Sequence, residues 1–171
     1  MQQWTCCPVC GTDLDVRTIE GRPRDYCSSC ERVHYHNPIP CAGVLVVDDD
    51  RLLLIERSEP PDVGAWSLPA GFLERDEPPE WAAIRELREE TNVRADADDL
   101  ELHETAFVDR PDGRTVLVVV YTVPVGLTIG TIRAGSDAES AEFWHLDRLL
   151  ADDEVRIESG YERAFRDAVD D

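Results

Sequence analysis

The chain has 171 residues, a length that allows one ordinary domain and a small appendage. Its net charge is −20, and every one of its 17 basic residues is arginine. An acidic chain lacks the basic surface that non-specific nucleic-acid binding requires, so we expect no nucleic-acid partner.

The absence of lysine is the second informative feature of the composition. Acidic, lysine-free surfaces are typical of proteins from salt-accumulating cytoplasms, where concentrated salt screens self-repulsion. The composition therefore predicts a halophilic protein, and an acidic protein of an ordinary cytosol is the alternative. Residues 1–6 lack the charged and apolar regions of a secretory signal, and the longest apolar run, residues 116–125, is too short to cross a bilayer. We expect a soluble cytoplasmic protein.

Two C-x2-C pairs lie near the N-terminus, Cys7 with Cys10 and Cys27 with Cys30. This spacing is typical of a structural zinc site with four thiolates. A reducing cytosol favours metal over disulfides, and the thioredoxin-like pattern that accompanies a redox C-x-x-C is missing from residues 1–40. A segment this short buries little apolar surface, so a bound Zn²⁺ would supply much of its folding free energy.

Three further residues could compete with this ligand set, and a sixth cysteine lies apart from it. Cys6 could replace Cys7 as the first ligand, and we favour Cys7. His34 and His36 are rival ligands that we interpret instead as a polar pair, and Cys41 is predicted to be a small buried residue.

From residue 42 onward the hydrophobic pattern predicts strands. Residues 43–47 and 52–55 form one expected hairpin, and residues 100–108 and 115–123 form a second one around a turn at 110–113. Residues 137–144 are expected to lead into a final strand, and Asp147 to cap a short helix. An amphipathic helix is predicted over residues 161–169.

The region between Gly71 and Val93 carries the densest pattern of charged residues. A loop containing Glu77 leads to Pro78 and Pro79, which suit the first turn of a helix. At about 100° per residue, Glu86, Glu89 and Glu90 fall on one helix face. The opposite face, with Trp81, Ile84 and Leu87, is expected to be buried.

Three carboxylates at this spacing repel one another unless a cation lies among them. Ligands that are all oxygen suit Mg²⁺ or Mn²⁺, so the face predicts a divalent metal site. A solvated acidic face is the alternative in a chain with 37 Asp and Glu residues.

These residues resemble the signature of the Nudix hydrolase family, G-x5-E-x7-R-E-U-x-E-E-x-G-U, in which U is apolar. The matching positions are Gly71, Glu77, Arg85, Glu86, Leu87, Glu89, Glu90 and Val93. Asn92 replaces the second glycine of the signature, and asparagine is the next most tolerant residue in the left-handed conformation that ends such a helix.

The resemblance implies a Nudix α/β/α sandwich with a mixed sheet over residues 38–171, preceded by a zinc ribbon over residues 1–37. It also implies that Glu86, Glu89 and Glu90 bind Mg²⁺ or Mn²⁺. Arg85 would orient Glu86, Glu77 would support the metal shell, and Gly71 would offer its carbonyl. We assign the general base to Glu139, with Glu142 and Glu86 as alternatives.

The implied reaction is metal-dependent hydrolysis of a diphosphate bridge. A ribbon followed by a Nudix domain resembles the zinc-ribbon branch of the family, which acts on ADP-ribose and FAD, and also resembles NADH pyrophosphatases in domain order. We expect hydrolysis of ADP-ribose or FAD to AMP and a phosphorylated product. The alternatives are a nucleoside triphosphate or NADH pyrophosphohydrolase and a non-enzymatic sensor of nucleotide metabolites. The oligomeric state is left open, with a homodimer as the candidate.

Overall fold

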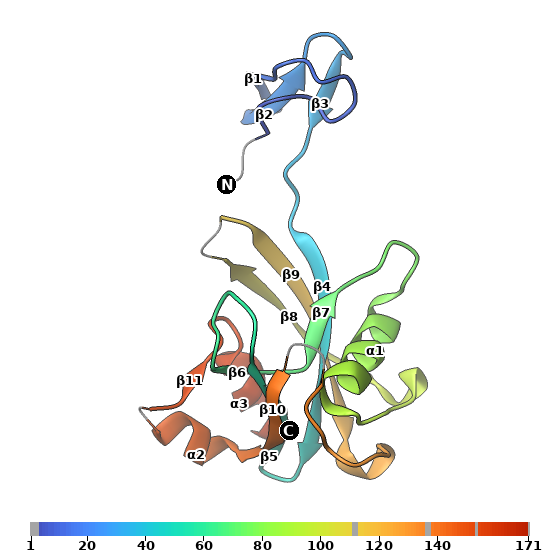
Figure 1. Ribbon diagram of the computed structural model, residues 1–171, viewed down its shortest axis with the longest axis vertical. Helices are drawn as coiled ribbons and strands as arrows, with labels where there is room; N and C mark the ends of the chain where they lie inside the picture. The colour runs from blue at the N-terminus through green and yellow to red at the C-terminus, as the bar shows by residue number, and fades with distance from the viewer. Residues whose placement is uncertain (1–3, 111–112, 136–137, 153, 171) are drawn as a thin grey trace.

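The computed structural model describes residues 4–110, 113–135, 138–152 and 154–170. Its N-terminal part is a small antiparallel sheet in the order β1-β2-β3, formed by β1 (Asp15–Ile19), β2 (Arg22–Cys27) and β3 (Arg32–His34). Residues 35–38 then lead into β4 (Ile39–Asp48), and Figure 1 shows the small sheet standing away from the large one at the end of this segment.

The large sheet contains eight strands within the described part of the chain. Its strands follow the order β11 (Arg156–Ile157), β6 (Ala65–Ser67), β5 (Arg51–Arg57), β4, β9 (Thr115–Pro124) and β8 (Glu101–Asp109). In addition, β10 (Ala138–His145) pairs with β5, and β7 (Ala70–Phe72) pairs with β4. The sheet is mixed because β4 runs parallel to β9 and antiparallel to β5 and β7.

Strand β4 lies at the centre of this sheet and is apolar on both faces. Cys41 and Leu45 belong to the core on one face, whereas Ala42, Val44 and Val46 belong to the core on the other. Side chains alternate between the two faces of a strand, so a continuous apolar run predicts burial on both sides. The sequence of β4 therefore requires a layer of helices over each face.

Helices supply both layers (Figure 1). Helix α1 (Pro79–Thr91) covers one face, and α2 (Leu146–Ala151) and α3 (Glu162–Asp170) cover the other, where Phe165 is fully buried. The predicted α/β/α sandwich is confirmed. Within the described residues, no helix combines the length and the apolar composition needed to span a membrane.

The prediction for the buried face of α1 was wrong for Trp81. Its side chain is 55% exposed, and Ile84 is only partly buried. Leu87 is buried as predicted, and the helix also buries Ala82 and Ala83. Two alanines in succession let the helix lie close to β4, where an indole ring would not fit.

Two further expectations about the C-terminal half need correction. Residues 138–145 form strand β10 themselves rather than leading into a strand. Helix α2 begins at Leu146 with His145 at the cap position, so Asp147 lies inside the first turn, where a negative charge suits the helix dipole. In the second predicted hairpin, Gly113 N donates to Arg110 O at 2.9 Å, while residues 111 and 112 lie outside the described residues.

Candidate active site

Helix α1 begins and ends as the sequence predicts. Pro78 occupies the cap position with Pro79 as the first helical residue. Asn92 ends the helix with φ 60° and ψ 11°, and its backbone N–H donates to Arg88 O at 2.9 Å. The Asn92 side chain also donates to Thr131 O at 2.8 Å, which holds the following loop against the helix. Asparagine therefore serves here in place of the second glycine of the signature.

Arg85 connects the loop before α1 to the carboxylates on the helix. Its Nε and Nη2 each donate to Glu77 at 2.9 Å, and Nη2 also donates to Phe72 O at 3.0 Å. Its Nη1 donates to Glu86 Oε1 at 2.5 Å. The hydrogen bonds from Arg85 lower the pKa of Glu77, and in return the pKa of Arg85 is raised. Glu77 and Arg85 are therefore held in their charged forms.

Glu86 lies directly against the backbone of Gly71. A Cβ built on Gly71 would stand 1.9 Å from Glu86 Oε1, so only glycine leaves room for the carboxylate. The predicted ligand carbonyl at Gly71 and the predicted ligand carboxylate at Glu86 are thus neighbours. Both residues line one cavity of about 370 Å³.

The other two glutamates of the face lie in different environments. Glu90 is only 1% exposed, and its Oε2 accepts a hydrogen bond from Ala70 N at 3.0 Å. Glu89 is more open, and its Oε2 lies 3.4 Å from Arg85 Nη1. A solvated acidic face does not bury one of its carboxylates, so this alternative is excluded at Glu90.

The donor set fits a hard divalent cation. Glu86, Glu89 and the backbone of Gly71 offer only oxygen and border the same cavity. Among the described residues, only the four cysteines form a group of three or more candidate metal ligands whose ligand atoms all lie within 4.8 Å of one another. The glutamates of α1 do not form such a group in this structure. Arg85 Nη1 donates to one oxygen of Glu86 and to one oxygen of Glu89, and so links these two carboxylates.

The predicted general base lies apart from this group. Glu139 is exposed on β10, at an irregularity in its pairing with β5, and it is not among the residues that line the cavity. Glu142 is also exposed. The loop before β10 is held against α1, because Gly135 N donates to Glu90 O at 3.1 Å. The role of Glu139 stays a prediction.

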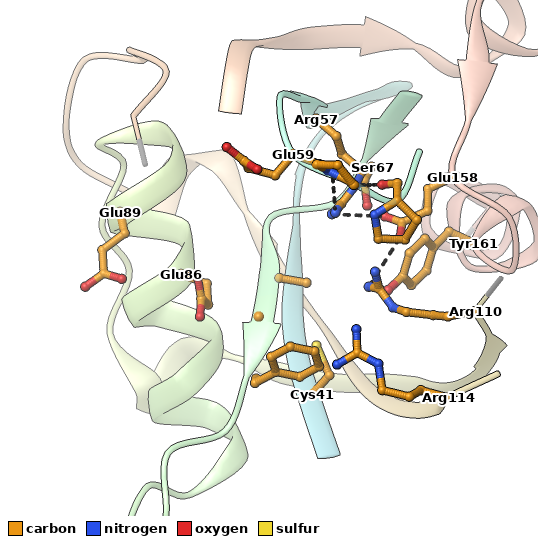
Figure 2. A pocket seen from close by; sticks show the side chains of 15 residues that line it. Cys41, Arg57, Glu59, Ser67, Glu86, Glu89, Arg110, Arg114, Glu158 and Tyr161 are labelled. Carbon is orange, nitrogen blue, oxygen red and sulfur yellow. Dashed lines mark hydrogen bonds and ion pairs between the residues drawn. The ribbon is translucent and has the colours of Figure 1, made fainter. Parts of the chain in front are cut away.

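The opposite side of the cavity carries three arginines that the sequence pattern did not single out as site residues. We call Arg57, Arg110 and Arg114 the arginine wall. Figure 2 shows these arginines, with Glu158 and Tyr161, on one side of β7, and Glu86 and Glu89 on the other side. No short motif could have identified them as one group, because Arg57 is the last residue of β5 whereas Arg110 and Arg114 flank the turn between β8 and β9.

The four predicted zinc ligands do come together. The sulfur atoms of Cys7, Cys10, Cys27 and Cys30 lie within 4.8 Å of one another. Backbone N–H groups of Val9 and Cys30 donate to the sulfurs of Cys7 and Cys27, both at 3.4 Å, as expected of knuckles that stabilise thiolates. Four clustered sulfur ligands fit Zn²⁺.

Two of the four clustered thiols, Cys10 and Cys30, have pKa values shifted in opposite directions. Hydrogen bonding to Thr12 lowers the pKa of Cys10 to about 6, whereas the hydrogen bond with Cys10 raises the pKa of Cys30 to about 12. Cys6 lies outside the cluster, which agrees with the choice of Cys7 as the first ligand, and its backbone pairs with that of Asp13.

The histidines beside the cluster are not in the ligand set. His34 Nε2 lies 3.4 Å from the Cys7 sulfur, so it can hydrogen-bond to a ligand. His36 Nε2 lies 2.6 Å from the carboxylate of the buried Asp25. Cys41 is buried beside the cavity, where burial raises its pKa to about 12.

Comparison with known proteins agrees with this geometry. The NUDIX domain family matches residues 37–164. An ADP-ribose pyrophosphatase of Methanocaldococcus jannaschii is 35% identical over 135 residues, which cover 77% of each chain. A protein named NAD-capped RNA hydrolase NudC, from Stutzerimonas stutzeri, is 29% identical over 154 residues, which cover 88% of this chain and 51% of that protein.

Solved structures extend the likeness to the fold. The crystal structure of a NUDIX hydrolase from Nitrosomonas europaea superposes with a TM-score of 0.68 and 23% identity, covering 95% of this chain and 91% of that one. At this identity the match concerns the fold alone. The family match covers most of the chain, and Gly71, Glu86 and Glu89 of the signature line one cavity. The chain therefore belongs to the Nudix hydrolases, as a pyrophosphohydrolase.

Proposed function

We propose that the protein hydrolyses the diphosphate bridge of a nucleoside diphosphate linked to another group, with ADP-ribose as the first substrate and FAD as the second. The observation that carries this proposal is the cavity of about 370 Å³ that has Glu86, Glu89 and Gly71 on one side. A cavity of that size next to an oxygen donor set suits part of a nucleotide. The name of the relative from Methanocaldococcus jannaschii supports ADP-ribose.

In this proposal Glu86, Glu89 and Glu90, with the Gly71 carbonyl, hold Mg²⁺ or Mn²⁺. When bound, such cations neutralise the charge that develops on the phosphate oxygens and make a water molecule more acidic. Arg85 fixes the position of Glu86, and Glu77 fixes Arg85 through its paired hydrogen bonds. The buried Glu90 is fixed by the backbone of Ala70.

The reaction consumes one water molecule. Glu139 accepts a proton from this water, whose oxygen forms a bond to one phosphorus of the bridge. The bond between that phosphorus and the bridging oxygen breaks, and the leaving phosphate carries the electron pair away. ADP-ribose would yield AMP and ribose 5-phosphate. Glu142 and Glu86 are the alternative bases.

We further propose that residues 1–37 form a ribbon held by Zn²⁺ through Cys7, Cys10, Cys27 and Cys30, and that the Nudix domain spans residues 38–171. The ring of sulfur atoms supports this assignment. A cytoplasmic location and a homodimer complete the proposal. Light scattering after size-exclusion chromatography tests the dimer.

A second candidate substrate is NADH or a related dinucleotide. The relative named NAD-capped RNA hydrolase NudC favours it, because its match covers 88% of this chain. Nucleoside triphosphates remain a third option.

The test is release of AMP from ADP-ribose, FAD and NADH, and of pyrophosphate from nucleoside triphosphates, with Mg²⁺ or Mn²⁺. Glu89→Gln and Glu90→Gln should each lower kcat by at least about a hundredfold, an effect expected when a charged group that stabilises the transition state is lost. Glu101→Gln is the matched control, because Glu101 is exposed on β8, outside the cavity. Cleavage of NADH or triphosphates without cleavage of ADP-ribose or FAD would overturn the substrate assignment.

A further inference from the structure

The arginine wall contrasts with the charge of the molecule. The protein carries a net charge of −20, yet three of its 17 basic residues border one cavity. Arginines are not expected to face one space in so acidic a chain unless negative charge is bound there. The wall faces the side of the cavity that carries Glu86 and Glu89 (Figure 2).

Glu158 compensates part of this positive charge. It is 3% exposed, and its carboxylate lies 3.6 Å from Arg57 Nη1 and 3.5 Å from Arg110 Nη2. Its backbone N–H donates to Trp66 O at 2.9 Å, which fixes its position relative to β6. One buried carboxylate shared by two arginines leaves positive charge on the wall.

The arginines of this pair are used differently. Arg57 uses its guanidinium to bind the protein's own backbone, because Nε donates to Pro61 O at 3.1 Å and Nη2 donates to Glu59 O at 3.4 Å. Arg110 has a buried Nε that has no hydrogen-bond partner among the described residues. Because Nε is buried, a ligand in the cavity would meet the Nη end of Arg110, which is 13% exposed as a side chain and lies 3.5 Å from Glu158 Oε1 through Nη2.

Two further titratable groups beside the wall add no negative charge to it. Tyr161 and Cys41 border the wall, but burial raises the pKa of Tyr161 well above its usual value and that of Cys41 to about 12, so both stay neutral. The carboxylate of Glu59 is exposed, and Figure 2 shows it turned away from Arg110 and Arg114.

We infer that the arginine wall is a phosphate subsite, in which Arg110 and Arg114 donate to the diphosphate oxygens that face away from the glutamates. Glu158 acts as a positioning residue for Arg110. The diphosphate would lie between the glutamates on one side and the wall on the other. This inference rests on the proposed function, because it assigns a substrate contact to the same cavity.

Inorganic pyrophosphate measures the subsite without turnover. Isothermal titration in EDTA, with no divalent cation, should detect pyrophosphate binding to the wild-type chain. Arg110→Gln and Arg114→Gln should each weaken it at least about tenfold, since each removes a charge-assisted hydrogen bond. Arg163→Gln is the control, because Arg163 lies on α3 outside the cavity and should leave binding unchanged.

The same variants separate this inference from the proposed function. With ADP-ribose and Mg²⁺, Arg110→Gln should raise KM with a smaller effect on kcat. Weakened pyrophosphate binding without ADP-ribose hydrolysis in the wild type would leave the subsite standing and overturn the substrate. The subsite would be overturned if both arginine variants bound pyrophosphate as tightly as the wild type, or if the wild type bound no pyrophosphate. If Arg110→Gln fails to fold, pyrophosphate binding by Arg114→Gln still tests the subsite, because Arg114 is exposed and its replacement should not disturb the fold.

Discussion

Arg85 and Glu77 form a paired ion contact, with Nε to Oε1 and Nη2 to Oε2 both at 2.9 Å. Eight positions separate them in sequence, so this contact fastens the loop of Glu77 to the second turn of α1. The same guanidinium reaches Glu86. Removing either partner of this pair should therefore lower both the stability of the fold and the rate of catalysis.

The variant Glu77→Gln should lower the free energy of unfolding by about 1–2 kcal/mol at pH 7, because hydrogen bonds to charged groups contribute on this scale. The pKa of Glu77 is lowered by Arg85 from its ordinary value of 4.5. A lowered folded-state pKa means that the stabilisation is complete above that ordinary value and disappears as pH falls through the folded-state pKa. Urea unfolding from pH 7 to pH 3 should show the two proteins converging.

Glu74→Gln controls for loss of a negative charge in the same loop, because Glu74 is exposed and is linked to Glu77 by its backbone. A stability difference between wild type and Glu77→Gln that stays constant down to pH 3 would contradict the pairing.

The variant Gly71→Ala should separate activity from stability. The added Cβ would lie 1.9 Å from Glu86 Oε1, and the end of this flexible side chain can turn away at small cost to the fold. Displacing a reacting group by about 1 Å can lower the rate about a hundredfold, so kcat/KM should fall on that scale while Tm changes little. Gly126→Ala is the control, because a Cβ added at Gly126 would meet nothing within 4 Å. Equal activity in both variants would show that Glu86 need not approach Gly71.

Replacing Cys27, which is fully buried, should remove zinc from the ribbon. Cys27→Ser should lower the zinc content from about one ion per chain to near zero and expose residues 4–37 to proteases, because a structural zinc site supplies folding free energy. Cys6→Ser should keep its zinc, since Cys6 lies outside the cluster. Loss of zinc from Cys6→Ser would reverse the choice between Cys6 and Cys7.

The buried ion group at Glu158 predicts a large effect on stability. Glu158→Gln should destabilise the fold by about 3 kcal/mol, because removing one partner leaves buried guanidinium groups without their counter-charge. Arg57 and Arg110 are each 13% exposed, so water can compensate only in part. Glu162→Gln, at an exposed position on α3, should stay within about 0.5 kcal/mol of wild type in the same urea titration. An equally small effect at Glu158 would show that the group is well hydrated.

The net charge of −20 predicts that the fold requires salt. The Debye length shrinks from about 10 Å at 0.1 M to about 3 Å at 1 M salt, so repulsion among surface carboxylates should weaken over this range. Thermal unfolding should therefore show Tm rising with potassium chloride. A Tm that is independent of salt would favour the alternative of an ordinary acidic cytosolic protein.

Local features of the fold could be predicted because neighbouring residues determine them. The start of α1 at Pro78 and Pro79 follows from the restricted backbone of proline, and its end at Asn92 follows from tolerance of the left-handed conformation. The exposure of Trp81 could not be predicted from helical periodicity alone. Its neighbour Ala82 belongs to the core cluster that α1 shares with Val44 of β4, and which residue is buried there depends on how the two elements pack.

Part of the candidate site could likewise be predicted from local sequence, whereas the rest depends on contacts between distant segments. Glu77, Arg85 and Glu86 stand close in sequence, so a motif could reveal them. Arg110 follows β8 and Glu158 follows β11, strands at opposite ends of the order in the large sheet, so no local pattern could predict their ion pair. The burial of Glu90 against Ala70 likewise depends on the return of the chain through β7.

The parallel pairing of β4 with β9 also constrains how the chain can acquire its structure. Ile39 pairs with Val116, and Val47 pairs with Pro124, so the centre of the sheet joins segments far apart in sequence. On the ribosome, β4 would emerge with its ribbon long before β9 is synthesised. Until then the apolar β4 has only its hairpin partners, and its remaining edge is open to other chains. Completion of the central sheet should therefore be a late and slow step, as expected for contacts of high sequence separation.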